Sequence, residues 1–314
     1  LKAHLNGDNL LPQNTARDLA FSQNGFLWIA TEDGLVCYDG LNTVTFETEN
    51  SNLSKNRMKC LLKTQEGELY AVNEDRNCYL ISDHPPTPVI QFTTCFTSLN
   101  KYNSSSMNLA PAKMQSLFSM FDSLNSNKSF TMNLVCAPDG NSGILKHPAG
   151  ILYFNLKKGL SVELNLVDFQ RWQMGFTQGY FVLYHPSGKL ITLLSANGER
   201  GHQSEIPAKA QMIWDDKTNQ LFFRSDRQLF ELSIEKDGQI KRNLLIQELP
   251  QDQILTVTTG WNKHLIVGTA TDGLFIYHQP GFKVIQASGV KKSFYAQAVL
   301  PDSNSVLCGP ELTI

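Results

Sequence analysis

A repeat of about 42 residues constrains the fold of this chain more than any other feature. GFLWIATED at 25–33 aligns without a gap with GELYAVNED at 67–75, and five weaker copies keep the same frame. The seven copies lie at 25–33, 67–75, 143–154, 179–194, 210–232, 254–277 and 303–309. They follow one another at about 40 residues, except for one longer interval between the second and third copies. This period, with several short strands in each copy, is typical of a β-propeller.

The first copy shows how one blade is built. Short apolar segments that favour strands lie at 16–21, 26–31, 35–39 and 43–48. The Asn-Gly and Asp-Gly dipeptides between them favour the positive φ values of hairpin turns. Large apolar residues recur at the position of Trp28, so we expect this side chain to fill the wedge between two blades. The sequence therefore predicts an all-β fold, a seven-bladed β-propeller of four-stranded antiparallel blades, as a single domain over residues 1–314.

The repeat frame also predicts how the ring closes. His4 and Leu5 align with the fourth strand of the first copy, so residues 2–6 are expected to form an outer strand that precedes the first full blade. We expect this strand to complete the last blade, because an open propeller would leave an unpaired edge. The last blade begins near residue 292 and reaches only its third strand at Ile314, so it is predicted to be incomplete in this chain.

The long interval between the second and third blades predicts an insertion at 98–130. Its ends are rich in Asn and Ser, and its middle has apolar residues at helical spacing over 112–124. This pattern favours a short amphipathic helix. The helix is expected either to pack as a cap on one face of the propeller or to act as a docking element.

Composition and motifs exclude several classes of function. The formal net charge of −2 argues against nucleic acid as a partner of this domain, because phosphate binding needs a basic surface. No hydrolase, metalloprotease or nucleotide motif occurs, and the histidines form no pair at metal spacing. We therefore predict no catalytic residues, no metal and no cofactor. The six scattered cysteines are expected to be buried free thiols, although their even number allows disulfides in an oxidising compartment.

Amide and basic side chains recur where the first strands of the first two copies begin. We call this set the basic rim; it comprises Asn14, Arg17, Lys55, Asn56, Arg57 and Lys59. Such groups could bind an acidic or hydroxylated ligand through dense hydrogen bonding. Alternatively, the amides cap their own loops and the basic side chains are solvated.

The first copy resembles the two-component regulator propeller repeat. The matching residues are Leu11-Pro12-Gln13-Asn14, Gly25, Leu27-Trp28-Ile29-Ala30-Thr31, Gly34-Leu35 and Tyr38-Asp39. Part of the motif returns in the sixth copy as Gly268-Thr269 and Asp272-Gly273-Leu274. In the second copy Arg76-Asn77 replaces Gly-Leu, so the strong motif covers only a small part of the chain.

The resemblance implies a location and a role. Propellers of this family form the extracytoplasmic, periplasmic sensor part of inner-membrane-anchored regulators, often hybrid histidine kinases, and many detect oligosaccharides from polysaccharide breakdown. The expected partners are an oligosaccharide or small-molecule ligand, a following propeller and β-sandwich of the same protein, and a second copy in a homodimer.

Two alternatives to a non-enzymatic sensor stay open. A propeller glycan lyase or hydrolase would need carboxylates that converge in one pocket. A scaffold that only dimerises would need an exposed apolar face.

Overall fold

The computed structural model describes two units of the chain, Leu1–Gln279 and Pro280–Ile314. The described residues are those of 1–278 outside 2, 65, 83–88, 94–101, 105–131, 138–140, 148, 195–199, 236–238 and 262, together with 295–299, 306–309 and 312–313. The fold is all-β, and the described part of the chain contains one short 3-10 helix, η2 (Phe169–Arg171).

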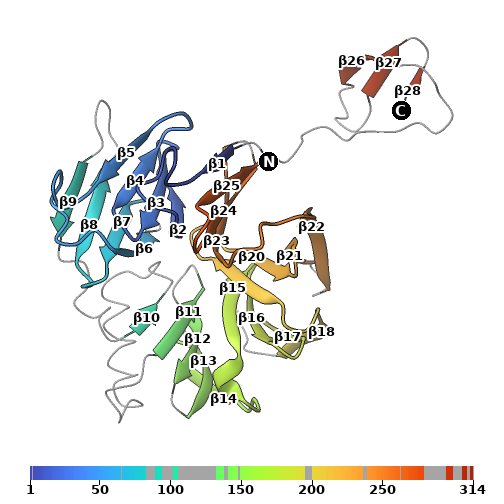
Figure 1. Cartoon of the computed structure of the whole chain (residues 1–314). Helices are drawn as coiled ribbons and strands as arrows, with labels where there is room; N and C mark the ends of the chain where they lie inside the picture. The colour runs from blue at the N-terminus through green and yellow to red at the C-terminus, as the bar shows by residue number, and fades with distance from the viewer. Residues whose placement is uncertain are drawn as a thin grey trace. The chain divides into compact units, whose positions relative to one another are not determined.

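The first unit contains six sheets that follow one another along the chain (Figure 1). The first two sheets are formed by β2 (Ala16–Phe21), β3 (Leu27–Thr31), β4 (Leu35–Tyr38) and β5 (Thr43–Phe46), and by β6 (Met58–Lys63), β7 (Leu69–Asn73), β8 (Cys78–Ser82) and β9 (Val89–Thr93). The third is formed by β10 (Tyr102–Ser104), β11 (Met132–Cys136), β12 (Ser142–His147), β13 (Gly150–Asn155) and β14 (Leu160–Leu164). The fourth is formed by β15 (Gln173–Thr177), β16 (Tyr180–His185), β17 (Lys189–Leu194) and β18 (Arg200–Glu205). The fifth is formed by β19 (Gln211–Asp215), β20 (Gln220–Ser225), β21 (Gln228–Ile234) and β22 (Ile240–Ile246). The sixth is formed by β23 (Ile254–Gly260), β24 (His264–Thr269), β25 (Leu274–Tyr277) and β1 (Ala3–Leu5).

Consecutive strands within each sheet pair antiparallel, and β10 alone among these pairings runs parallel to its neighbour β11. The first strands of neighbouring sheets pack against one another: β2 contacts β6 and β23, and β19 contacts β15 and β23. This packing of successive first strands is the arrangement of propeller blades. The prediction of four-stranded antiparallel blades is thus confirmed for most sheets of the first unit.

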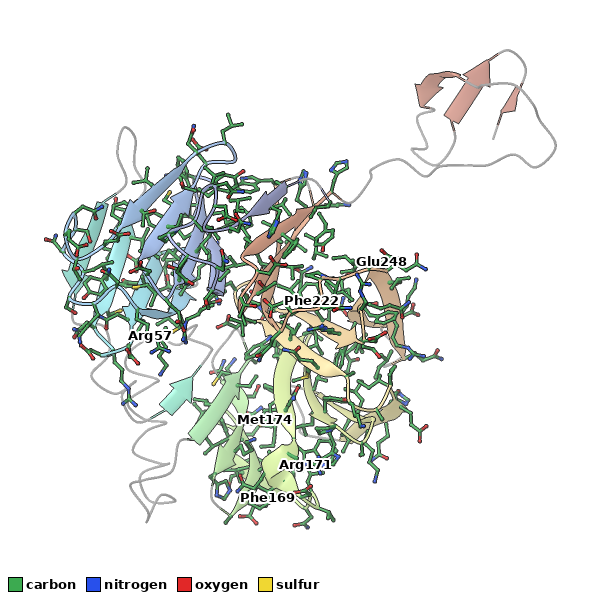
Figure 2. The ribbon with its side chains drawn as sticks, in the orientation of Figure 1. Arg57, Phe169, Arg171, Met174, Phe222 and Glu248 are labelled. Atoms are coloured by element: carbon green, nitrogen blue, oxygen red, sulfur yellow. The ribbon has the colours of Figure 1, made fainter. Side chains whose placement is uncertain are left out.

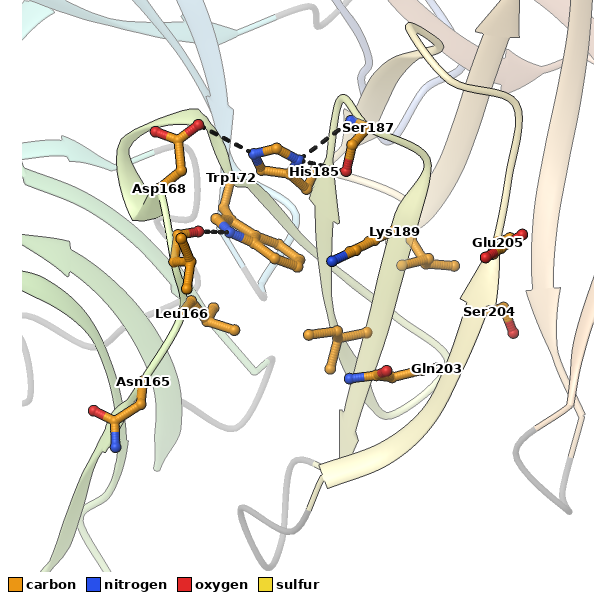
Figure 3. Close-up of a pocket in the computed structure, with 13 residues that line it drawn as sticks. Asn165, Leu166, Asp168, Trp172, His185, Ser187, Lys189, Gln203, Ser204 and Glu205 are labelled. Carbon is orange, nitrogen blue, oxygen red and sulfur yellow. Dashed lines mark hydrogen bonds and ion pairs between the residues drawn. The ribbon is translucent and has the colours of Figure 1, made fainter.

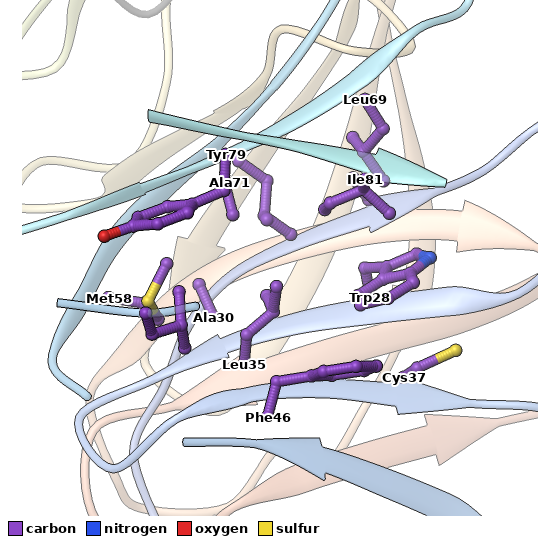
Figure 4. Packing of buried hydrophobic residues seen from close by; sticks show 13 residues of the cluster. Trp28, Ala30, Leu35, Cys37, Phe46, Met58, Leu69, Ala71, Tyr79 and Ile81 are labelled. Atoms are coloured by element: carbon purple, nitrogen blue, oxygen red, sulfur yellow. The ribbon is translucent and has the colours of Figure 1, made fainter. Parts of the chain in front are cut away.

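Trp28 fills the space between the first two sheets, as its repeat position predicted. Its side chain is fully buried and its ring stacks on Phe46, with the centroids 5.6 Å apart. Figure 4 shows it between Phe46 of the first sheet and Ile81 of the second, within one apolar cluster. Burying so large a side chain contributes strongly to the stability of this contact between blades.

The N-terminal strand was predicted to pair with the wrong blade. β1 pairs with β25, in a register that sets Ala3 opposite Ile276 and Leu5 opposite Leu274. Ala3–Leu5, within the predicted strand at 2–6, therefore completes the sixth sheet and not a blade that begins near 292. β23, β24 and β25 follow one another in this sheet, and β1 occupies the outer position beside β25. Leu5 is 1% exposed there, and His4 stacks on Phe275.

The second unit contains one small antiparallel sheet, formed by β26 (Tyr295–Val299), β27 (Val306–Gly309) and β28 (Leu312–Thr313). It carries the seventh copy of the repeat, and the single domain over 1–314 stays a prediction. The count of seven blades in one ring stays a prediction. Within the predicted insertion at 98–130 the structure describes only β10, and the predicted helix at 112–124 lies outside the described residues.

Candidate functional site

Asn14 and Asn56 of the basic rim hold loops together. Each side-chain oxygen accepts a hydrogen bond from a backbone N–H group seven or eight residues earlier, at 2.7 and 2.8 Å. Each backbone carbonyl also accepts one from a turn glycine of the preceding sheet in the ring, Gly273 for Asn14 and Gly34 for Asn56. The same bonds at equivalent repeat positions favour the loop-capping interpretation for both amides.

The two arginines of the basic rim are paired with carboxylates. Glu32 accepts hydrogen bonds from Arg17 and, at 3.2 Å, from Arg57, and Arg57 (labelled in Figure 2) also lies 3.5 Å from Glu74. The hydrogen bond from Arg17 outweighs partial burial and lowers the pKa of Glu32. Glu32 and Glu74 therefore neutralise the two arginines.

The two lysines of the basic rim lie apart from these ion pairs. Lys59 occupies a β-bulge in β6, between Met58 and Cys60, and Arg17 occupies the equivalent bulge in β2. Bulges re-aim a side chain and are common beside functional sites. Lys55 is exposed in the loop before β6. The structure thus brings together Arg17, Asn56 and Arg57 but does not show a ligand site that unites all six residues.

A buried ionic cluster that the sequence analysis missed joins distant blades. We call it the Lys217 cluster; it comprises Asp18, Asp215, Asp216 and Lys217. The ammonium of Lys217, in the turn after β19, lies 2.6 Å from Asp18 on β2 and 2.9 Å from Asp216. Asp18 also accepts a hydrogen bond from the backbone of β6, and Asp215 accepts one from the hydroxyl of Thr258 on β23. The cluster thereby connects the fifth blade to the first, second and sixth blades.

The Lys217 cluster places three carboxylates around one buried ammonium, and burial raises the pKa of two of these carboxylates. Burial raises the pKa of Asp216 to about 7, with Asp18 and Asp215 adding repulsion and Lys217 opposing it. Burial also raises the pKa of Asp215. For Lys217, burial lowers the pKa, but the attraction of the carboxylates outweighs it and the net shift is upward. Burial raises the pKa of the neighbouring Cys60 thiol to about 12, so it is not a reactive thiol.

A pocket of about 480 Å³ lies beside the linker that joins β14 to β15 (Figure 3). We call it the Trp172 pocket. It is lined by Asn165, Leu166, Val167, Asp168, Trp172, His185, Ser187, Lys189, Leu190, Ile191, Gln203, Ser204 and Glu205. The linker, part of which is labelled as Phe169 and Arg171 in Figure 2, forms one wall, and β17 and β18 with the turn before β17 form the other. Sequence analysis missed this site because its lining residues come from segments that carry no motif.

The linker wall is held by several hydrogen bonds. Lys146 on β12 donates to the carbonyls of Gln170 and Trp172, both at 3.1 Å, and burial lowers the pKa of Lys146. The indole N–H of Trp172 donates to the carbonyl of Val167 at 3.1 Å. These bonds fix the indole at the wall of the pocket, where its ring lies 5.2 Å from that of His185.

His185 is the polar centre of the pocket. Its Nδ1 accepts hydrogen bonds from the backbone N–H of Ser187 at 3.2 Å and from the Ser187 hydroxyl at 2.8 Å. Its Nε2 lies 3.5 Å from Asp168 Oδ2 and is buried without a hydrogen-bond partner. In a hydrolytic triad the serine bonds Nε2 and the carboxylate bonds Nδ1. Here the two nitrogens have the opposite partners, and the backbone bond to Nδ1 is that of a turn, so the arrangement favours binding over hydrolysis.

Among the described residues, no group of three or more His, Cys, Asp or Glu residues could hold a metal ion. Cys37, Cys60 and Cys136 are not in disulfide bonds, whereas Cys78 on β8 is disulfide-bonded. The expectation of free thiols throughout was therefore wrong for Cys78. Across the same described segments, no helix has the length and apolar character needed to cross a membrane.

Comparison with known proteins finds likeness in structure rather than in sequence. No protein-family model matches the chain, and no curated protein matches it. The extracellular domain of BT4673 from B. thetaiotaomicron aligns at a TM-score of 0.59 and 10% identity, over 88% of this chain and 43% of that one. A second structure of BT4673, described as a hybrid two-component system, aligns at 0.56 and 12%, over 88% and 42%. This chain therefore spans less than half the length of that extracellular domain.

A propeller enzyme also aligns. A catalytically inactive virginiamycin B lyase from Staphylococcus aureus, crystallised with quinupristin, gives a TM-score of 0.55 and 14% identity, over 87% of this chain and 97% of that one. At such identities all three comparisons show a shared fold.

Proposed function

We propose that this chain is part of the extracytoplasmic sensor domain of a membrane-anchored signalling protein, and that it binds an oligosaccharide and relays a conformational signal. The repeat motif around Trp28 carries the proposal, and the likeness to the extracellular domain of BT4673 supports it. The output domain is proposed to be a histidine kinase of the hybrid type, in a periplasmic setting. Seven blades are part of the same proposal, supported by the seven sequence copies.

The disulfide at Cys78 supports a location outside the cytoplasm. Structural disulfides persist in oxidising compartments and are rare in the cytosol. Cys78 is buried on β8, so its bond is protected from solvent.

The described site residues favour a binding protein over an enzyme. The rim carboxylates Glu32 and Glu74 are occupied by arginines, and the His185 environment has the geometry of a turn. The likeness to virginiamycin B lyase keeps a lyase or hydrolase as the second candidate.

A thermal-shift screen against acidic and neutral oligosaccharides tests the proposal. A ligand that binds only the folded state stabilises it by mass action, by about 2.7 kcal/mol at a ligand concentration a hundredfold above Kd. This stabilisation raises the melting temperature. We expect a selective shift, with the sugar recovered intact. Recovery of cleaved sugar would establish the enzyme instead, and a panel without any shift would favour the dimerisation scaffold.

A further inference from the structure

The Trp172 pocket has the size and the fixed walls of a small-molecule site. Pockets for small ligands typically enclose about 300–1,000 Å³, and this one encloses about 480 Å³. Lys146 holds the linker wall. In the opposite wall Gly188 has a φ of +94°, and a Cβ there would lie 2.6 Å from the carbonyl of Ile206. Only glycine fits this turn, which a hydrogen bond from Ile206 to Gly188 fastens to the segment after β18.

His185 directs an unused donor at this site. Because the backbone N–H of Ser187 donates to Nδ1, that nitrogen carries no proton and the proton of the neutral ring lies on Nε2. Nε2 is buried without a hydrogen-bond partner, since Asp168 Oδ2 remains 3.5 Å away. Buried donors are almost always satisfied in folded proteins, so an oxygen of a bound molecule would complete this site.

Lys189 provides the second unused donor. In Figure 3 its amino end points toward Trp172. Glu205 lies opposite Lys189 in the β17–β18 pairing, yet within the described part of the chain Lys189 has no ion-pair partner within 4.0 Å. The other carboxylate of the pocket, Asp168, already lies 3.6 Å from Arg171. Lys189 therefore supplies a positive charge beside the indole that has no ion-pair partner among the described residues.

The remaining lining residues define the rest of the ligand. Trp172, Leu190 and Ile191 are apolar and buried, and they suit a flat apolar face. The amides and hydroxyls suit a ligand with several hydroxyl groups; they belong to Asn165, Gln203, Ser187 and Ser204.

The geometry points to a sugar acid as the occupant, with its carboxylate at Lys189, a ring hydroxyl at His185 Nε2 and one face of its ring against Trp172. This inference rests on the proposed function, which supplies a saccharide as the ligand class. It adds that the saccharide is a uronate and that it binds at the fourth blade, away from the basic rim.

Calorimetric titration of the 314-residue chain tests the inference. The probes are an oligogalacturonate and a neutral galacto-oligosaccharide of the same length. The variant is Lys189→Met, which keeps most of the side-chain volume, and the matched control is Lys241→Met on the exposed face of β22. We expect the oligogalacturonate to bind preferentially, Lys189→Met to weaken it by at least about tenfold, and Lys241→Met to leave it unchanged.

The outcomes separate this inference from the proposed function. If an oligosaccharide binds equally well to Lys189→Met and to the unmodified chain, the sensor proposal stands and the Trp172 pocket is not its site. If the neutral sugar binds as tightly as the uronate, the acidic class is wrong. If neither probe and no other saccharide binds the folded chain, the sensor proposal fails as well. A circular dichroism melt of Lys189→Met confirms that the variant is folded in each case.

Discussion

Replacing Lys217 by Met should destabilise the first unit more than any other exchange of a lysine among the described residues. Its side chain is 9% exposed, and its ammonium lies between Asp18 and Asp216 at 2.6 and 2.9 Å. Removing it leaves buried carboxylates without a counter-charge. Breaking a buried ion pair in this way costs about 3–5 kcal/mol, whereas an exposed lysine contributes less than about 0.5 kcal/mol. The loss should fall on the contacts between the fifth, first and second blades.

Urea unfolding monitored by tryptophan fluorescence measures this cost. We expect the midpoint of Lys217→Met to fall by an amount equivalent to about 3–5 kcal/mol, with Lys241→Met unchanged. In the double variant Lys217→Met with Asp18→Asn, part of the loss should be recovered, because one uncompensated charge is gone. A Lys217→Met protein within about 0.5 kcal/mol of the unmodified chain would show that the cluster is not a buried ion pair, and would refute the reasoning.

Asp216, Cys78 and Leu5 provide three further tests. The folded state keeps the proton of Asp216 up to about pH 7, whereas the unfolded state releases it near the ordinary pKa of 3.8. The folded state therefore binds more protons between these values, and this group makes stability fall as the pH rises from about 4 to 7. Asp216→Asn should flatten that part of a profile of melting temperature against pH, and an unchanged profile would contradict the assignment. Peptide mapping without reductant should recover Cys78 in a disulfide-linked peptide, and reduction should cost about 2–4 kcal/mol of stability; recovery of Cys78 as a free thiol would refute this. Leu5→Ala should lower the free energy of unfolding by about 2–4 kcal/mol, because Leu5 is buried in the sixth sheet. The control is Leu41→Ala, since Leu41 is exposed. Equal stability of the two variants would argue against the β1–β25 pairing.

Local structure could be predicted well from the sequence. Alternating apolar residues and Asn-Gly or Asp-Gly turns specify strands and hairpins over a few residues, so the strands of the first blade lie within one or two residues of their predicted limits. The burial of Trp28 was predictable for a related reason, because repeated copies report the environment of a shared position.

Long-range choices could not be predicted in the same way. The strand at 3–5 was recognisable, but its apolar pattern suits any blade that lacks an outer strand, and the repeat frame did not distinguish the sixth sheet from the seventh copy. The pairing of Asp18 with Lys217 joins residues 199 positions apart, and an isolated Asp-Asp-Lys turn looks like an exposed surface turn. The Trp172 pocket depends on a linker without periodicity. The residues of the basic rim lie near the starts of β2 and β6, but sequence could not show that its arginines are neutralised by Glu32 and Glu74.

Hydrogen–deuterium exchange of the chain with and without a saturating oligosaccharide tests the central claim most directly, since it reports both where a ligand binds and whether the effect spreads. The account predicts slower exchange in peptides that cover 165–172 and 185–194, a smaller change in blades remote from them, and recovery of the sugar intact. Unchanged exchange in these segments under saturating ligand, or recovery of cleaved sugar, would contradict it.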